Sequence, residues 1–306
     1  MSTKKVNCLN IAFIFRASVG SINGGWTEGN VSTVKKITLP NGNRLPYVSG
    51  QSLKYQIRRY WAEANADLSP VAKADKDEGV NFTAGEPAKY IDDDLLGYMI
   101  ATKDVNRRRT AVVRTSAAIG IFPFQGDRDL GTKSKEKEVG GDMGTGGNIF
   151  ETEIYYNYFR VNILVELDRL GNFQPFELRK KDENVNLKIE ERRRRVEVLL
   201  DAVEHLWGGG KQSRVLSDIS PQFVALTFQT VKSPIFLESL TVNPDETLHT
   251  EAVKQVLDDY ANIIAYKATG VRAGIFKNEV VKEIDGTLSI HKAFENARSY
   301  LKTLDF

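Results

Sequence analysis

Hydroxyl, amide and cationic side chains lie close together where a predicted helix begins, in the segment PYVSGQSLKYQIRRYW. A Ser-Gly turn into a helix leaves backbone N–H groups without partners, and those groups and the helix dipole attract an anion. Lys54 and Arg58 add positive charge, while Ser49, Gln51 and Ser52 add neutral donors. Such a set can hold the backbone of a nucleic acid without reading its bases. The alternative is a capped helix with a basic, solvent-exposed face.

Cationic residues gather at two further places along the chain. Arg16 ends the first predicted strand, and we expect it to lie near the same bound polyanion. A second cluster leads into a later predicted strand and holds Arg107, Arg108, Arg109 and Arg114. Charge on a sheet face often serves binding, and protection of an exposed sheet edge is the competing explanation.

A glycine-rich loop, Gly208–Gly210, follows the helix that the sequence predicts most clearly. Its spacing excludes a nucleotide-binding phosphate loop, because GxxxxGK[ST] is missing and the loop follows a helix instead of opening one. Gly208 is expected to end that helix. The residues after the glycines can nevertheless hold a phosphate backbone beside the predicted sheet. They are Lys211, Gln212, Ser213 and Arg214.

The composition predicts a protein without a metal or a catalytic centre. The 306 residues include one cysteine, Cys8, and three widely spaced histidines, which excludes a multi-cysteine zinc site. No Ser/His/Asp or Cys/His set is visible in the spacing. We therefore expect neither an enzyme nor a bound cofactor.

Charge and hydropathy describe a soluble chain with two contrasting segments. The net charge of +2 combines a basic segment, residues 1–60, with an acidic one, residues 61–100. This contrast suggests a polyanion site and a second, different surface. Because the sequence has no run of about 18 apolar residues and no signal-peptide pattern, we expect a cytoplasmic protein without a membrane span.

Hydrophobic alternation predicts the elements that position these side chains. VNCLNIAFIF and YYNYFRVNILVEL alternate as strands, and residues 16–30 between elements are expected to form a loop with an exposed Trp26. A helix is predicted for SGQSLKYQIRRYWAEA, with Ser49 as its N-cap, and another for IEERRRRVEVLLDAVEHLW. The run Arg192–Arg195 is expected to lie on a solvated face with local ion pairs. The order of elements fits an α+β domain with a split βαβ, ferredoxin-like core.

Two segments interrupt this core. Residues 66–97 are acidic and turn-rich, so we expect an irregular insertion with little core of its own. Residues 125–148 combine glycines and mixed charges with few large apolar side chains, so they cannot pack a core. This composition predicts a long, flexible excursion of β type.

The segment S-G-Q-S-L-K-x-x-I-R resembles the signature of the Cas7 family, whose members form the backbone of CRISPR surveillance complexes. It follows the first strand and its loop, as in that family. RTSAAIGIFPF, GNIFETEIYYNYF and HLWGGGKQSRVLSDISP are similar to the Cst2/DevR branch. These matches cover most of the chain, and their order and spacing agree with the branch.

The resemblance implies an architecture and a set of RNA contacts. It implies one RRM-like (ferredoxin-like) RAMP domain over residues 1–306, with palm, finger and thumb parts. The finger-like insertion would be residues 66–105 and the thumb-like hairpin residues 125–150. Ser49, Gln51, Lys54 and Arg58 would contact the guide-RNA backbone. Met143 would be the apolar wedge of the thumb.

The resemblance also implies a function and its partners. The chain would bind crRNA without cleaving it, oligomerise along the guide in a type I Cascade complex, of subtype I-B, and leave the bases free to pair with target DNA. Its partners would be further copies of itself and Cas5-like, Cas8-like and small subunits.

Two alternatives come from other classes of protein. One is a ribonuclease that cuts target RNA, but the loop 16–30 offers only Glu28 where a metal-dependent cut needs a carboxylate. The other is a protein-binding assembly or regulatory module that uses the acidic segment and the excursion at 125–148.

Overall fold

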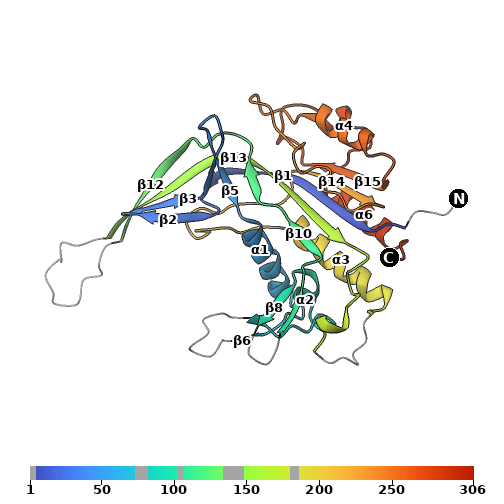
Figure 1. Ribbon diagram of the computed structural model, residues 1–306. Helices are drawn as coiled ribbons and strands as arrows, with labels where there is room; N and C mark the ends of the chain where they lie inside the picture. The colour runs from blue at the N-terminus through green and yellow to red at the C-terminus, as the bar shows by residue number, and fades with distance from the viewer. Residues whose placement is uncertain (1–4, 73–81, 102–105, 134–147, 180–185) are drawn as a thin grey trace.

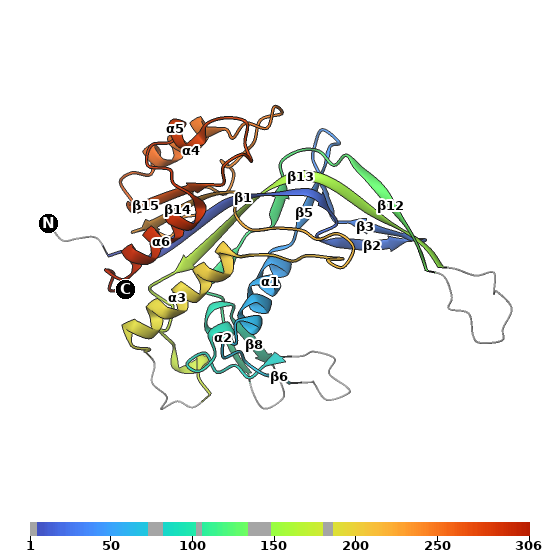
Figure 2. The same cartoon turned by 180° about the vertical axis from the view of Figure 1, so that it is seen from behind.

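The protein folds around one large mixed sheet with helices on both faces (Figures 1 and 2). The computed structural model describes residues 5–72, 82–101, 106–133, 148–179 and 186–306. The central strands lie in the order β14-β1-β13-β11, and α1 and α3 connect them across the sheet. This antiparallel arrangement is the split βαβ, ferredoxin-like core. The predicted α+β class is therefore confirmed.

The central strand β1 (Cys8–Gly20) is buried on both faces, as its sequence predicts. Leu9, Ile11, Phe13 and Phe15 belong to the core that also contains residues of α1, α3 and α6. The alternate residues, such as Ile14, belong to a second core under the C-terminal region. β1 continues to Gly20, and residues 24–28 form a further strand, so the prediction of a loop over residues 16–30 is wrong. Trp26 is exposed, as predicted.

The strand β13 (Asn148–Glu166) contacts more neighbours than any other described strand, because it pairs with β1, β3, β10, β11 and β12. Its hydrophobic alternation is read correctly from the sequence, since Phe159, Val161, Ile163 and Val165 are all buried. The predicted strand over residues 106–122 is instead divided into three short ones. They are β9 (Asn106–Arg109), β10 (Val113–Thr115) and β11 (Ala118–Gly120).

The helix α1 (Gly50–Glu63) begins as its sequence predicts. The Ser49 side chain accepts a hydrogen bond from the Ser52 N–H at 3.3 Å, which caps the helix. Leu53, Ile57 and Trp61 form the buried stripe. Trp61 also donates to the carbonyl of Val198 on α3 (Ile189–Glu204), which joins the two helices on one face of the sheet (Figure 1).

The acidic segment is packed more tightly than its composition suggests. It forms β6 (Val71–Ala72), β7 (Phe82–Thr83), α2 (Ile91–Leu95) and β8 (Tyr98–Ala101). Ile91 and Leu95 join the main core, and Asp92, Asp93 and Asp94 are all buried. The expectation of an irregular insertion with little core is therefore wrong for α2, because buried arginines from other elements balance its carboxylates.

A long arm projects from the sheet (Figures 1 and 2). We use the name arm for β2 (Gly24–Glu28), β3 (Val31–Val34), β12 (Gly126–Lys133) and residues 148–156 of β13. β12 pairs antiparallel with β13 from Gly126 opposite Tyr155 to Lys133 opposite Asn148. The predicted β-type excursion thus has a paired base. Met143 lies outside the described residues.

The C-terminal region extends the sheet and covers its second face (Figure 1). The amphipathic patterns near residues 250–266 and 289–304 each predict a helix. The second is confirmed, whereas the first helix ends at Asp259, and the strand that follows at residues 264–271 is not predicted. The remaining elements are β4 (Lys36–Thr38), β5 (Arg44–Val48), η1 (Pro175–Glu177), β14 (Phe223–Gln229), α4 (Thr250–Asp259), β15 (Ile264–Val271), α5 (Val280–Glu283) and α6 (Ile290–Leu301).

Candidate nucleic-acid interface

The first turn of α1 packs against the segment between β10 and β11. A Cβ on Gly50 would lie 2.6 Å from the Thr115 carbonyl oxygen, so only glycine allows this close approach. Gln51 is exposed, while Ser49 and Ser52 are half-buried at the helix start. The sequence therefore brings backbone donors, hydroxyl groups and an amide together at the start of α1, as predicted.

Lys54 is the cation closest to this helix start. It is half-buried, and no described residue forms a hydrogen bond or an ion pair with it. Burial lowers the pKa of Lys54, and the positive charge of Arg114 lowers it further. Two cations held close together, one of them without a counter-charge, favour the binding of an external anion.

Arg114 is held in place by a buried carboxylate. Its guanidinium contacts Glu166 at 2.5 Å, and 57% of its side chain is exposed. Glu166 also binds Arg169 at 3.3 Å and Lys232 at 3.1 Å. Burial raises the pKa of Glu166, but the bonds and charges of Lys232, Arg169 and Arg114 outweigh it and hold the pKa below the usual value. Glu166 therefore stays ionised and orients several cations at once.

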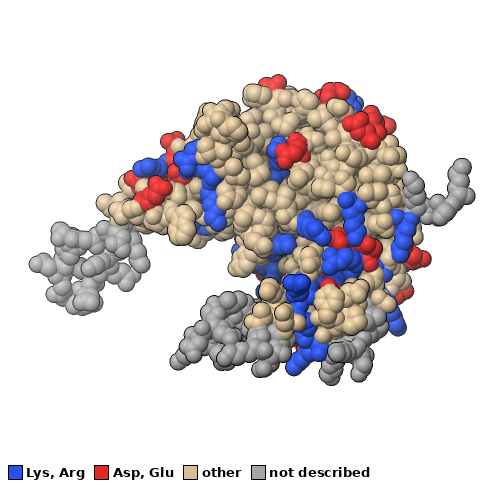
Figure 3. Space-filling model, viewed as in Figure 1, with Lys and Arg blue, Asp and Glu red and all other residues tan. Residues whose placement is uncertain are grey.

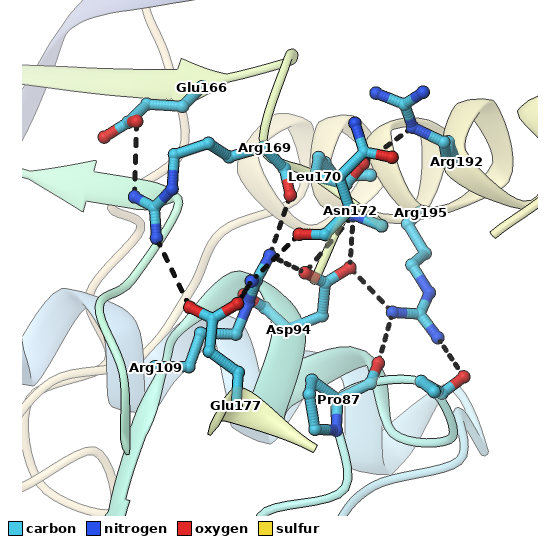
Figure 4. Close-up of polar contacts among 12 residues, drawn as sticks. Pro87, Asp94, Arg109, Glu166, Arg169, Leu170, Asn172, Glu177, Arg192 and Arg195 are labelled. Atoms are coloured by element: carbon cyan, nitrogen blue, oxygen red, sulfur yellow. Dashed lines mark hydrogen bonds and ion pairs between the residues drawn. The ribbon is translucent and has the colours of Figure 1, made fainter. Parts of the chain in front are cut away.

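Arg109 does not belong to this surface, although it lies only five residues from Arg114. Its side chain is fully buried, with Asp94 at 2.6 Å and Glu177 at 2.7 Å (Figure 4). Burial of a guanidinium is tolerated only when it is paired and hydrogen-bonded. The prediction that Arg109 contacts RNA is corrected accordingly, because all three guanidinium nitrogens donate hydrogen bonds to acceptors inside the protein.

The arginine run of α3 contributes to the same internal network. Arg195 is buried and contacts Asp94 at 2.7 Å and the Pro87 carbonyl at 2.8 Å (Figure 4). Arg192 is buried and donates to the Leu170 carbonyl. The expected solvated face is thus wrong for these two arginines. The local ion pairs are confirmed, since Glu191 binds Arg194 and Arg195.

Two other predicted contacts have partners within the fold. Arg58 binds Asp92 at 2.9 Å and the Ser69 carbonyl at 2.9 Å. Arg107 donates to the Ala84 carbonyl at 3.0 Å. Both side chains therefore join the acidic segment to the core, and any contact with RNA would have to share these bonds.

Arg16 lies on the sheet face opposite α1. It alternates with Phe15, which faces the α1 side, and its guanidinium lies 5.9 Å from the centre of the Tyr158 ring. Hydrogen bonding of the Arg16 guanidinium to the Tyr158 hydroxyl oxygen, which accepts, raises the pKa of Arg16. The structure therefore does not bring Arg16 together with Lys54.

The glycine-rich loop packs against the end of β1 and the base of the arm. A Cβ on Gly208 would lie 2.2 Å from the Gln56 side-chain oxygen, and the Gly210 N–H donates to the Ile22 carbonyl. Lys211 donates to the Thr152 hydroxyl at 2.8 Å, and Arg214 binds Asp129 of β12.

The four predicted binding residues of this loop differ in exposure. Ser213 and Arg214 are exposed, while Lys211 and Gln212 are half-buried. The Gln212 side-chain oxygen accepts from the Ser217 N–H at 3.1 Å. Burial lowers the pKa of Lys211, and so does Arg214. These residues form a second cationic site, beside the arm and apart from Lys54 and Arg114.

Lysine and arginine side chains gather around β10 and the loops below it on the face shown in Figure 3, with acidic side chains among them. We define the cationic surface as Lys54, Arg108, Arg114, Arg169 and Lys232. Sequence reasoning missed the last two as site residues. Neither lies in a motif, and only the three-dimensional position of Glu166 brings them beside Arg114.

Within the described part of the chain, neither a metal-binding group of side chains nor a membrane-spanning helix is present. No group of three or more His, Cys, Asp or Glu side chains is arranged there to hold a metal ion. Glu28, the acid of the ribonuclease alternative, is exposed at the end of β2. No helix among the described residues is long and apolar enough to cross a membrane.

The fold is shared with solved structures of low sequence identity. A chain of a structure titled "CRISPR RNA-guided surveillance complex, pre-nicking" has a TM-score of 0.61 at 15% identity, over 96% of this chain and 100% of that chain. A chain of a "CRISPR RNA-guided surveillance complex" has a TM-score of 0.60 at 16% identity, over 96% and 99%. At this identity the likeness defines the class of fold.

The sequence defines the family more narrowly. The family model "CRISPR-associated negative auto-regulator DevR/Csa2" matches residues 11–251. A Myxococcus xanthus (strain DK1622) protein, "CRISPR-associated protein Cas7/Cst2/DevR", is 32% identical over 130 residues, which are 38% of this chain and 43% of that protein. The alignment thus spans less than half the length of this relative. The chain belongs to the DevR/Csa2 family of CRISPR-associated proteins, as a Cas7 of the Cst2/DevR branch.

Proposed function

We propose that this chain is a non-catalytic subunit that binds the backbone of crRNA and lines up in several copies along the guide of a type I Cascade complex. The observation that carries the proposal is Lys54, which lies half-buried beside Arg114 at the start of α1 and has no counter-charge among the described residues. Ser49, Gln51 and Ser52 add neutral donors there. These groups recognise phosphate and sugar, so the bases stay free to pair with target DNA.

The proposal is supported by the solved structures that share this fold, because both belong to CRISPR RNA-guided surveillance complexes. In such a complex the acidic segment would serve as the finger and the arm as the thumb. The second cationic site, at Lys211 and Arg214, would hold the RNA beside the arm. Arg16, Arg58 and Arg107 would make secondary contacts.

A role in assembly is favoured by the exposed apolar residues of the arm. Trp26 is 89% exposed, Leu130 61% and Ile149 55%. Exposed apolar side chains grouped on one element indicate a surface that a partner covers. We propose that this partner is a further copy of the chain or another subunit, Cas5-like, Cas8-like or small.

RNA binding measured at several salt concentrations tests the main proposal. The purified chain should bind single-stranded RNA with little sequence preference, and its affinity should fall steeply with salt. Lys54→Ala and Arg114→Ala should each weaken binding to every sequence and lower the salt slope by about one. Lys254→Ala, an exposed lysine of α4, is the matched control. Binding that ignores salt, or Lys54→Ala behaving like the control, would contradict the proposal.

A cleavage assay with Mg²⁺ and a complementary RNA tests the ribonuclease alternative. We expect no cleavage by the wild type. Cleavage that is lost in Glu28→Ala would assign the activity to this carboxylate and overturn the non-catalytic role.

A further inference from the structure

A pocket of about 380 Å³ lies beside the cationic surface, between β9 and the segment 168–177. Arg108 and Thr110 border it on one side, and Arg169, Asn172, Gln174 and Phe176 on the other. We propose that this pocket receives one unpaired nucleotide of the RNA strand that the cationic surface binds. The inference rests on the proposed function and adds a contact to a base.

Phe176 offers a ring on which a base can stack. It belongs to the short helix η1 and is 64% exposed, whereas its neighbours Phe173 and Leu178 are each 4% exposed. The fold therefore buries the apolar residues on either side of Phe176 and leaves this ring in solvent. Stacking on an aromatic side chain is the usual way in which proteins hold an unpaired base.

Arg108 offers the charge for a phosphate. In β9 the flanking residues Arg107 and Arg109 turn inward to their partners, and Arg108 lies on the opposite, exposed side. Met99, its neighbour across the β8–β9 pair, is also exposed. Among the described residues Arg108 has no hydrogen-bond or ion-pair partner. Its guanidinium is thus available to an external anion.

The carboxylates that line the pocket are already balanced. Glu177 contacts Arg109 at 2.7 Å, and Asp168 contacts Lys232 at 2.7 Å. Because Glu177 and Asp168 are paired, they repel a phosphate less than unpaired carboxylates would. Among the charged described residues that line the pocket, Arg108 is left without a counter-charge. Asn172 and Gln174 bring amide groups, which can donate to and accept from the edge of a base.

One carboxylate separates the pocket from the proposed phosphate site. Glu166 contacts Arg114 of that site at 2.5 Å and Arg169 of the pocket wall at 3.3 Å (Figure 4 shows the latter). The pocket therefore lies within reach of a strand whose phosphate is bound at Arg114. This position favours a nucleotide of the same strand over an unrelated ligand.

The test compares a single-stranded RNA with a strand of equal length that carries no bases. Phe176→Ala should weaken binding of the normal RNA about 5- to 100-fold and leave the abasic strand unchanged. Phe176→Tyr, which keeps the ring, should restore binding. Arg108→Ala should weaken both strands, because it removes a phosphate contact. Tyr260→Ala, an exposed aromatic residue next to α4, is the matched control.

Two results would overturn the inference and differ from a failure of the proposed function. If Phe176→Ala matches the control on both strands, or weakens both equally, while Lys54→Ala still weakens both, the pocket holds no base. If the wild type binds neither strand and Lys54→Ala changes nothing, the RNA-binding role itself is wrong.

Discussion

Two groups of basic side chains lie in opposite environments, although a series of ion pairs runs from Arg114 of one group to Arg109 of the other. Arg109 and Arg195 are buried and share Asp94 (Figure 4). Lys54 and Arg114 lie at the surface, where Arg114 pairs with one carboxylate and Lys54 pairs with no carboxylate of the described residues. In the first group the protein satisfies its own charges. In the second, like charges are held together at a cost to the fold, which is typical of a binding site.

The largest effect should come from breaking the buried group. Asp94→Ala removes the carboxylate that two buried guanidinium groups share, and we expect it to lower the free energy of unfolding by about 3–5 kcal/mol. Urea unfolding of the two proteins measures the loss. Glu63→Ala, which removes an exposed pair with Arg59, should cost less than about 1 kcal/mol. If Asp94→Ala and Glu63→Ala lose equal free energies of unfolding, the buried ion pairs are no more important to stability than the exposed pair, which would contradict this description.

A smaller effect should follow from disturbing the helix start that presents the surface group. Gly50→Ala places a methyl group 2.6 Å from the Thr115 carbonyl, so the first turn of α1 must move. We expect a loss of about 1–3 kcal/mol in the free energy of unfolding and weaker RNA binding. Gly24→Ala has open space around its Cβ and serves as the control in the same two assays. If Gly50→Ala binds RNA with unchanged affinity, RNA binding does not depend on the position of the first turn of α1.

The smallest effect should have the opposite sign. The folded-state pKa of Lys54 is lowered, so folding favours the neutral amine and the charged form destabilises the fold. Lys54→Met should therefore raise the free energy of unfolding at neutral pH by about 0.5–1 kcal/mol while weakening RNA binding. The free energy of unfolding of the wild type rises as pH increases through the lowered pKa of Lys54. The difference in this free energy between Lys54→Met and the wild type should therefore shrink as pH approaches the ordinary lysine pKa. A variant that is less stable at neutral pH would contradict this.

The sequence predicts what depends on near neighbours. Alternation in β1 and β13, and the cap that Ser49 gives α1, depend on residues a few positions apart, and these predictions are confirmed. The Ser49–Lys54 group is likewise one helix turn, so its residues stay together in the structure. The same holds for the paired base of the hairpin at β12.

The fate of the charges could not be predicted, because their partners lie far away in the sequence. Asp94 meets Arg195 across 101 positions, and Arg114 meets Glu166 across 52. A local pattern shows a basic run or an acidic segment and gives no sign of whether the charge is buried and paired. Arg109 and Arg114 have the same side chain and lie on strands that follow each other in the sequence, yet only the fold assigns one to the interior and the other to solvent.

The length of β13 has a mechanical consequence. Its 19 residues extend without interruption for about 60 Å, from the arm through the middle of the sheet. The same strand is bonded to β12 at one end and to β1 along the core. It therefore acts as a stiff beam and not as a tether. A molecule bound to the arm would therefore be held at a fixed distance and angle from the core of this chain.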